Sequence, residues 1–165
     1  IDVGTNSNVP NALIYPMPKT ALEGKFSIPF CMAIAVIERK AGIAQFQDRK
    51  VRDQKVIELM KRVTLYVDEE LERLGYDQVR SRIRVKLKDG RVVGDRYDVA
   101  RGHPTKPMSW AELTEKFRDC AGLVLSRKKV DETIRLLEQF QNLNSLRPLV
   151  RALTNANGQS STKCL

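Results

Sequence analysis

Hydrophobic residues cluster in a way that predicts several helices. Residues 28–37 form an almost wholly apolar run, which is typical of a helix buried on most of its sides. Ser27 is a good N-cap residue for this helix, and Pro29 is tolerated in a first turn because early helical N–H groups have no partner. We expect the helix to end at Gly42. A second helix is expected after the cap residue Asp53, with an apolar face made of Val56, Leu59, Met60 and Val63.

Two further patterns predict strands. Residues 63–68 are β-branched and aromatic, which favours a strand. Residues 79–88 alternate with period two and are followed by Asp89-Gly90 and a second alternating run. A turn dipeptide between two such runs predicts a β-hairpin over residues 79–99. Residues 1–24 are rich in Asn and Pro, which predicts loops with room for one short strand at the start.

The C-terminal third is predicted to be helical. Ser109 and Glu112 have the spacing of a capping box, and three short amphipathic segments follow. We therefore expect the α+β class, with a small antiparallel sheet made of the 79–99 hairpin and the strand near 63–68, and with helices packed on one of its faces. The expected divisions are an α+β domain over 1–108, C-terminal helices over 109–153 and a polar, disordered tail over 154–165, all within one structural unit.

Composition restricts the class of protein. The chain has 165 residues, of which 42% are hydrophobic and 30% charged, as in a folded globular domain. Its net charge of +9 favours an anionic partner. Three widely separated cysteines are typical of reduced thiols in a cytoplasmic protein, and the longest apolar run is about half of what spans a bilayer. We expect a cytoplasmic protein without a membrane partner. The first residue is Ile, so we expect a fragment of a longer chain.

The predicted hairpin carries five cations on one face. They are Arg80, Arg82, Arg84, Lys86 and Lys88. Such a row could follow the phosphates of a nucleic acid. A two-residue loop, however, would set Arg84 opposite Asp95 and Arg82 opposite Tyr97, so the charges would be paired within the hairpin. We expect a solvated sheet face and consider nucleic acid an unlikely partner, since Tyr97 alone could stack on bases. A basic module that binds a polyanion through residues 79–99 is the alternative.

Lys25 stands just before the apolar helix. The N-terminus of a helix attracts anions, and Lys25 with the Ser27 hydroxyl would add a charge and a donor at the same place. That arrangement suits a small carboxylate. A lysine whose stem passes the buried helix and reaches solvent explains the pattern equally well. His103 is the single histidine, and its role is loop structure or contact with a substrate from a mobile loop. We expect neither a metal nor a cofactor.

Four stretches in colinear order resemble the C-terminal part of the MmgE/PrpD family. They are "LEGKFSIPFCMAIAVIERKAGIAQF", the spacing "D-x-x-V-x-x-L-M-x-R-V" of residues 53–63, "VKLKDGR" and "GHPTKPMSWAELTEKF". The resemblance covers roughly residues 20–153. It implies the smaller α+β lid domain of an enzyme whose large helical domain is missing from these residues. It also implies an active site between the two domains, no metal cofactor, and proton transfer next to a carboxylate of a di- or tricarboxylate.

The resemblance suggests where a substrate would bind. Lys25, Ser27, Phe30 and His103 are the candidates for contact with the substrate. Several relatives have a tyrosine where this sequence has Phe30, which puts the reaction itself in doubt. The family's catalytic residues lie mainly in the helical domain, so no catalytic residue is named here. We expect the lid of a 2-methylcitrate dehydratase-like lyase of propionate catabolism, inactive without the helical domain and homo-oligomeric. A purely structural dimerisation domain is a weaker alternative.

Overall fold

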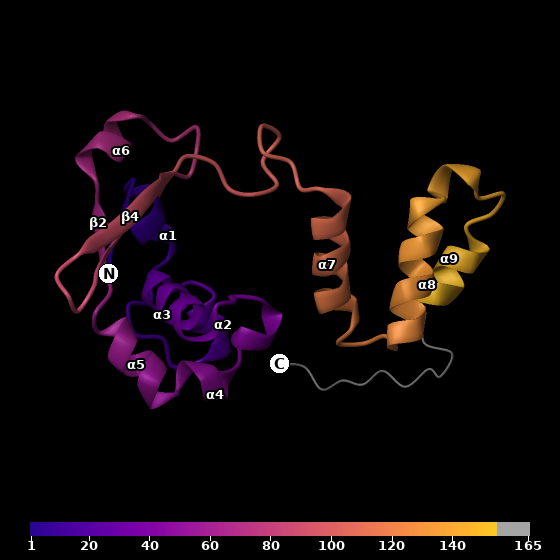
Figure 1. The fold of residues 1–165 in the computed structure, drawn as a ribbon, viewed down its shortest axis with the longest axis horizontal. Helices are drawn as coiled ribbons and strands as arrows, with labels where there is room; N and C mark the ends of the chain where they lie inside the picture. The colour runs from indigo at the N-terminus through magenta and orange to yellow at the C-terminus, as the bar shows by residue number, and fades with distance from the viewer. Residues whose placement is uncertain (155–165) are drawn as a thin grey trace. The chain divides into compact units, whose positions relative to one another are not determined.

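The computed structural model describes residues 1–154, and the chain divides into two compact units (Figure 1). Unit 1 comprises Ile1–Pro107, and unit 2 begins at Met108. Except for Thr154, the predicted polar tail 154–165 lies outside the described residues. None of the helices within residues 1–154 is long and apolar enough to cross a membrane.

Unit 1 contains one sheet and several short helices. Its strands are β1 (Asp2–Thr5), β2 (Thr64–Val67), β3 (Ser81–Lys86) and β4 (Val92–Tyr97). Its helices are α1 (Asn8–Ala12), α2 (Ala21–Gly24), α3 (Ile28–Glu38), α4 (Asp48–Val51), α5 (Gln54–Met60) and α6 (Glu69–Arg73), with a 3-10 turn at Ile43–Gln45. The fold is α+β, as the sequence predicts.

The sheet is mixed, which corrects the expectation of an antiparallel sheet. Its strand order is β2-β1-β3-β4, and β1 runs parallel to β2 but antiparallel to β3. The residue pairs run from Asp2 with Thr64 to Thr5 with Val67 in the parallel ladder. Parallel neighbours require a long crossover connection, and the chain between β1 and β2 carries α1 to α5. The sequence predicted the strand at 63–68, but it did not predict that this strand pairs with β1.

The hairpin forms where predicted, but its register differs by one residue. Arg84 lies opposite Gly94 and Arg82 opposite Arg96, so the pairs expected with Asp95 and Tyr97 do not form. The physical reason is a three-residue loop: Leu87 N–H donates to the carbonyl of Arg91 (2.8 Å). Gly90 is the third loop residue, with φ of 87°, the left-handed conformation that such loops require. A tighter turn would need Asp89 in that conformation as well.

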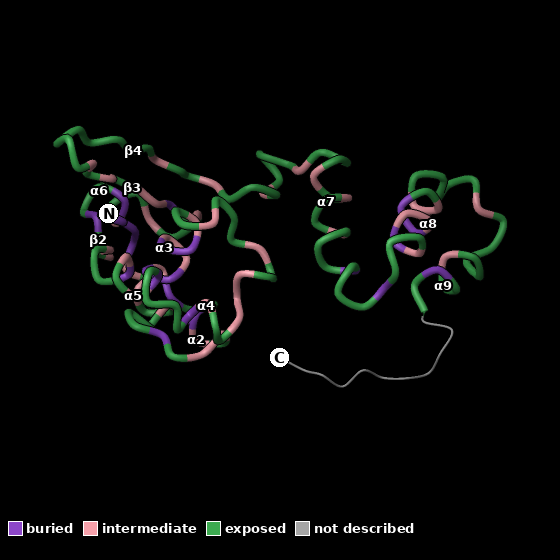
Figure 2. Tube along the Cα trace, turned by 60° about the horizontal axis from the view of Figure 1, so that its bottom comes forward, coloured by how far each residue is buried: buried purple, intermediate pink, exposed green. Residues whose placement is uncertain are grey.

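The core of unit 1 is formed by α3, α4 and α5, and Figure 2 shows buried stretches of the chain near these helices and near the N-terminus. Its buried members are Phe30, Ala33, Ile34, Val51, Val56 and Met60. The rings of Phe30 and Phe46 meet edge to face with centroids 5.5 Å apart. Helix α3 ends at Glu38, earlier than the expected Gly42, because Arg39 takes a left-handed conformation with φ of 56°.

Unit 2 is a small helical unit. Its helices are α7 (Trp110–Ala121), α8 (Arg127–Glu138) and α9 (Arg147–Leu153), with a 3-10 turn at Phe140–Asn142. The predicted capping box is present at the start of α7, where Ser109 and Glu112 bond reciprocally. Helix α8 packs against α9, and a small apolar cluster joins α7 to α8. The cluster consists of Ala121, Leu125, Val130 and Ile134, with Phe117 beside them.

Candidate functional site

Lys25 lies in the tight turn that joins α2 to α3. The backbone N–H of Lys25 donates to the carbonyl of Leu22 (3.1 Å), and that of Ser27 donates to the carbonyl of Gly24 (3.3 Å). These bonds hold the turn, while the Lys25 side chain is exposed. Its ammonium forms no hydrogen bond or ion pair with any residue in the described range 1–154. The backbone bonds therefore fix where the Lys25 side chain begins, and no group within residues 1–154 pairs with its charge.

Ser27 and Phe30 are buried beside Lys25. The Ser27 hydroxyl accepts a hydrogen bond from the Phe30 N–H (3.2 Å), which makes Ser27 the N-cap of α3 as the sequence predicts. Neither residue exposes any surface to solvent. Ser27 thus provides a hydrogen-bond acceptor for an otherwise unpaired N–H group in the first turn of α3, and the Phe30 ring is part of the core of unit 1. Their contact with a substrate stays a prediction.

The side chains of Phe30 and Val51 pack closely against Gly24, at the start of this turn. A Cβ atom on Gly24 would lie 3.2 Å from both Phe30 Cδ1 and Val51 Cγ2, which is tighter than ordinary packing. The Cys31 thiol donates to the Gly24 carbonyl (3.8 Å), and burial raises the pKa of that thiol. The packing around Gly24 is therefore apolar and close, and Lys25, the next residue, is the charged residue of this turn and is exposed to solvent.

His103 belongs to a compact loop of its own. Its Nδ1 accepts from the Thr105 N–H (3.2 Å) and lies 2.8 Å from the Thr105 hydroxyl. The backbone N–H of Lys106 donates to the carbonyl of His103 (2.8 Å), which closes the turn. No hydrogen bond or ion pair within residues 1–154 joins His103 to Lys25, Ser27 or Phe30. The structure shows a role in the loop, and contact with a substrate stays a prediction.

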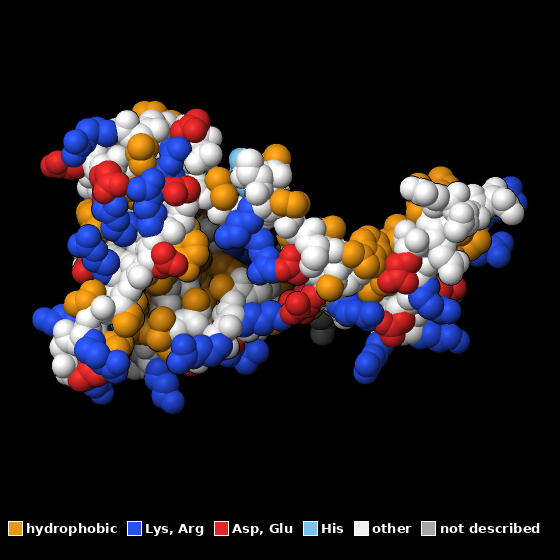
Figure 3. Space-filling view, turned by 45° about the horizontal axis from the view of Figure 1, so that its top comes forward, with side chains coloured by type: hydrophobic (Ala, Val, Ile, Leu, Met, Phe, Trp, Pro, Cys, Tyr) orange, Lys and Arg blue, Asp and Glu red, His pale blue; other side chains and the backbone are white. Residues whose placement is uncertain are grey.

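Carboxylates bind two of the five hairpin cations. Arg82 donates to Asp68 (2.7 Å) and Glu70 (2.5 Å), while the buried Arg80 donates to Asp77 (2.9 Å). The hydrogen bond from Arg82 is the main cause that lowers the pKa of Glu70, and it also favours the charged form of Arg82. In Figure 3, basic and acidic side chains alternate over this part of unit 1.

The alternative function, binding of a polyanion through residues 79–99, rested on a row of five cations, and the structure reduces that row. The sequence places five cations on one face of the hairpin, but Arg80 is paired with Asp77 and Asp98, and Arg82 with Asp68 and Glu70. Arg84, Lys86 and Lys88 have no ion pair with any residue between 1 and 154, so a shorter basic row remains at the end of the hairpin. Three exposed cations without an aromatic platform are a weaker site for a nucleic acid than five.

Asp68 is the residue that sequence reasoning missed in this region. It is 6% exposed and caps α6, because its Oδ1 accepts from the N–H groups of Glu70 (3.0 Å) and Leu71 (3.2 Å). An aspartate between a strand and an acidic first turn was a visible capping signal. Its second partner, Arg82, lies on another strand and left no local signal. Residues 1–154 contain no group of three or more His, Cys, Asp or Glu side chains placed to hold a metal ion.

Comparison with known proteins gives a family. Cis-aconitate decarboxylase of Mus musculus is 27% identical over 150 residues, which are 91% of this chain and 30% of that protein. The Homo sapiens protein of that name is 28% identical over 139 residues, covering 84% of this chain and 28% of its own length. The protein of that name from Aspergillus terreus strain NIH 2624 is 25% identical over 138 residues, which are 82% of this chain and 28% of that protein. The chain thus spans less than a third of these relatives.

The family match covers most of the chain. The MmgE/PrpD C-terminal domain matches residues 1–142, which include the Lys25 turn, the whole sheet and helices α7 and α8. The resemblance seen in the sequence is confirmed. The chain belongs to the MmgE/PrpD family and carries its C-terminal domain.

Proposed function

We propose that this chain is the C-terminal part of a lyase that acts on a tricarboxylate, and that Lys25 binds one carboxylate of the substrate. The observation that carries the proposal is the exposed side chain of Lys25, whose ammonium has no ion pair within residues 1–154 and which follows the closely packed Gly24 just before α3. A small polycarboxylate fits one such cation better than a long polymer, which needs a continuous row of charges.

The strength of this contact depends on water. An exposed ion pair is worth about 0–1 kcal/mol, because solvent screens the charges. The same pair in a site that excludes water contributes more to transition-state stabilisation. We therefore propose that the rest of the enzyme, an N-terminal helical domain, covers the Lys25 turn and supplies the catalytic base. The chain alone is inactive on this proposal.

Two reactions are compatible with this role for Lys25. Relatives named cis-aconitate decarboxylase favour loss of CO2 from cis-aconitate. Dehydration of 2-methylcitrate, the expectation from the sequence, is the second candidate. Both substrates are tricarboxylates, so both leave Lys25 the same task of neutralising a carboxylate that does not react. Phe30 has no hydroxyl, so proton transfer at that position would need another group.

The experiment is an assay of the enzyme that contains this chain as its C-terminal part. The enzyme is incubated separately with cis-aconitate and with 2-methylcitrate. CO2 release and formation of the dehydrated product are then measured. We expect CO2 from cis-aconitate with a kcat/KM at least tenfold above that for 2-methylcitrate, a difference of about 1.4 kcal/mol. The reverse order would assign dehydration instead. Absence of both reactions would refute the proposed substrate class.

A further inference from the structure

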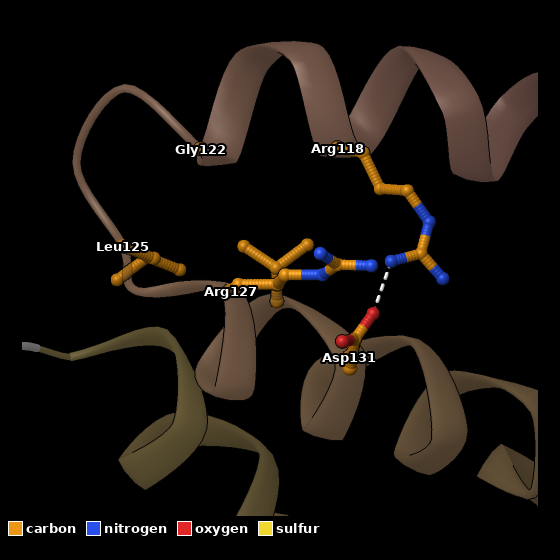
Figure 4. Close-up of a pocket in the computed structure, with 6 residues that line it drawn as sticks. Arg118, Gly122, Leu125, Arg127 and Asp131 are labelled. Carbon is orange, nitrogen blue, oxygen red and sulfur yellow. Dashed lines mark hydrogen bonds and ion pairs between the residues drawn. The ribbon is translucent and has the colours of Figure 1, made fainter.

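A cavity of about 480 Å³ lies in unit 2, between the end of α7 and the start of α8. Figure 4 shows its lining. The lining residues are Arg118, Gly122, Leu125, Arg127, Val130 and Asp131. All of them come from one helix–turn–helix segment, which also contains the apolar cluster of this unit. The local chain alone therefore builds the cavity.

Two guanidinium groups share one carboxylate in this cavity. Arg118 on α7 donates to Asp131 on α8, and this bond is the main cause that keeps the pKa of Asp131 below its usual range. The side chain of Arg127 points toward the same pair (Figure 4). No hydrogen bond or ion pair within residues 1–154 involves Arg127, but its charge, like that of Arg135, also acts on Asp131 and helps to lower the pKa of that carboxyl group. These three side chains together carry a net charge of +1, so within residues 1–154 one positive charge of the cavity has no counterion of its own.

The helix increases this excess of positive charge. The N-terminus of a helix carries a partial positive charge and is normally accompanied by acidic side chains. Helix α8 instead begins with three cations, Arg127, Lys128 and Lys129, and has no acidic residue in its first turn. An arrangement of this kind is unfavourable in isolation and becomes favourable when an anion binds.

The floor of the cavity has a different character. Leu125 and Val130 line it, and both are nearly buried, at 9% and 3% exposed. A ligand that reaches the guanidinium groups would lay its remaining atoms on these side chains. Apolar surface removed from water contributes to binding in proportion to its area. Because little of either side chain is exposed, the gain comes mainly from the ligand's own apolar surface that the floor covers, which favours a ligand with an apolar body over citrate or inorganic phosphate.

We propose that this cavity binds a small organic anion that joins one carboxylate or phosphate head to a short apolar chain. The head lies between Arg127 and Arg118, where it completes the charge balance, and the chain lies on Leu125 and Val130. The site lies entirely in unit 2 and uses none of the residues of the Lys25 turn. Its ligand class also differs from the proposed tricarboxylate substrate.

The test is isothermal titration calorimetry on the 165-residue chain with hexanoate, hexyl phosphate, acetate and citrate. We expect saturable binding of hexanoate at least tenfold tighter than that of acetate or citrate. Hexyl phosphate distinguishes the two head groups, because the tighter of the two hexyl ligands identifies the head. Equal affinities for acetate and hexanoate would refute the role of the apolar floor, and no binding of either hexyl ligand would refute the site.

Two matched variants locate the site. Arg127→Gln removes the unpaired charge and should weaken hexanoate binding at least tenfold. Lys128→Gln removes the same charge from the same helical turn but outside the cavity lining, and should change binding less than twofold. Equal weakening in both variants would mean that the overall positive charge attracts the ligand, which overturns the proposal. Trp110, the one tryptophan of the chain, lies on α7, so its fluorescence melting curve checks that each variant keeps unit 2 folded.

Discussion

Replacing Asp68 with alanine removes two kinds of contact from unit 1. One carboxylate oxygen caps α6, and the other accepts from Arg82 at 2.7 Å. Loss of an N-cap costs about 1 kcal/mol, and loss of a hydrogen bond to a charged group costs about 1.5–3 kcal/mol. Arg82 keeps its second partner, Glu70, at 2.5 Å. We therefore expect Asp68→Ala to lower the free energy of unfolding of unit 1 by about 2–4 kcal/mol.

Urea unfolding can measure this change in unit 1 alone. The four tyrosines of the chain lie in unit 1 and its one tryptophan lies in unit 2, so near-ultraviolet circular dichroism of tyrosine reports on unit 1. Asp68→Asn keeps a capping oxygen and should lose only the ionic part. Glu69→Ala, with a side chain 93% exposed, should change stability by less than about 0.5 kcal/mol. A loss below about 1 kcal/mol in Asp68→Ala, or equal losses in both Asp68 variants, would refute the reasoning.

Four further outcomes follow from the same structure. Arg82 lowers the folded-state pKa of Glu70, so this stabilisation is complete above the unfolded pKa and is lost as the pH falls. The melting temperature of unit 1 should therefore fall as the pH drops below about 4, and Arg82→Leu should reduce that dependence. Ser27→Ala removes the α3 cap and should cost about 1 kcal/mol in urea unfolding, whereas an unchanged midpoint would show that the cap contributes nothing. Phe30→Ala should cost about 3–5 kcal/mol, because this ring is fully buried. Phe30→Tyr should cost about 1–3 kcal/mol if its hydroxyl finds no partner, and full stability would show that the hydroxyl reaches one.

Local signals in the sequence predicted local structure well. Ser27, Asp53 and Ser109 each cap the helix that follows them, because capping depends on residues within one turn. The hairpin was also predicted from local pattern. Its register was wrong because the dipeptide Asp89-Gly90 allows both a two-residue and a three-residue loop. One residue of register then changed the partner of Arg84 from Asp95 to Gly94.

Contacts between distant segments were not predictable from local pattern. Arg82 lies opposite Arg96, a pairing of like charges that is unfavourable by itself. Glu70 offsets it by accepting from both arginines, and it reaches them from α6. The parallel pairing of β1 with β2 likewise joins segments about sixty residues apart, which hydrophobic periodicity cannot reveal. The cavity of unit 2 was missed for a different reason: its residues lie close in sequence, but Arg118 and Asp131 meet only through the way α7 and α8 pack together.

The central claim is that Lys25 binds a carboxylate of the substrate, and steady-state kinetics of Lys25→Ala in the enzyme that contains this chain tests it most directly. Lys88→Ala is the matched control, since Lys88 is an exposed lysine of the same unit in the hairpin loop. We expect kcat/KM for the tricarboxylate to fall at least tenfold in Lys25→Ala, about 1.4 kcal/mol, and to stay within twofold in Lys88→Ala. Unchanged kinetics in Lys25→Ala would contradict the claim and leave Lys25 as a lysine that extends past a buried helix into solvent.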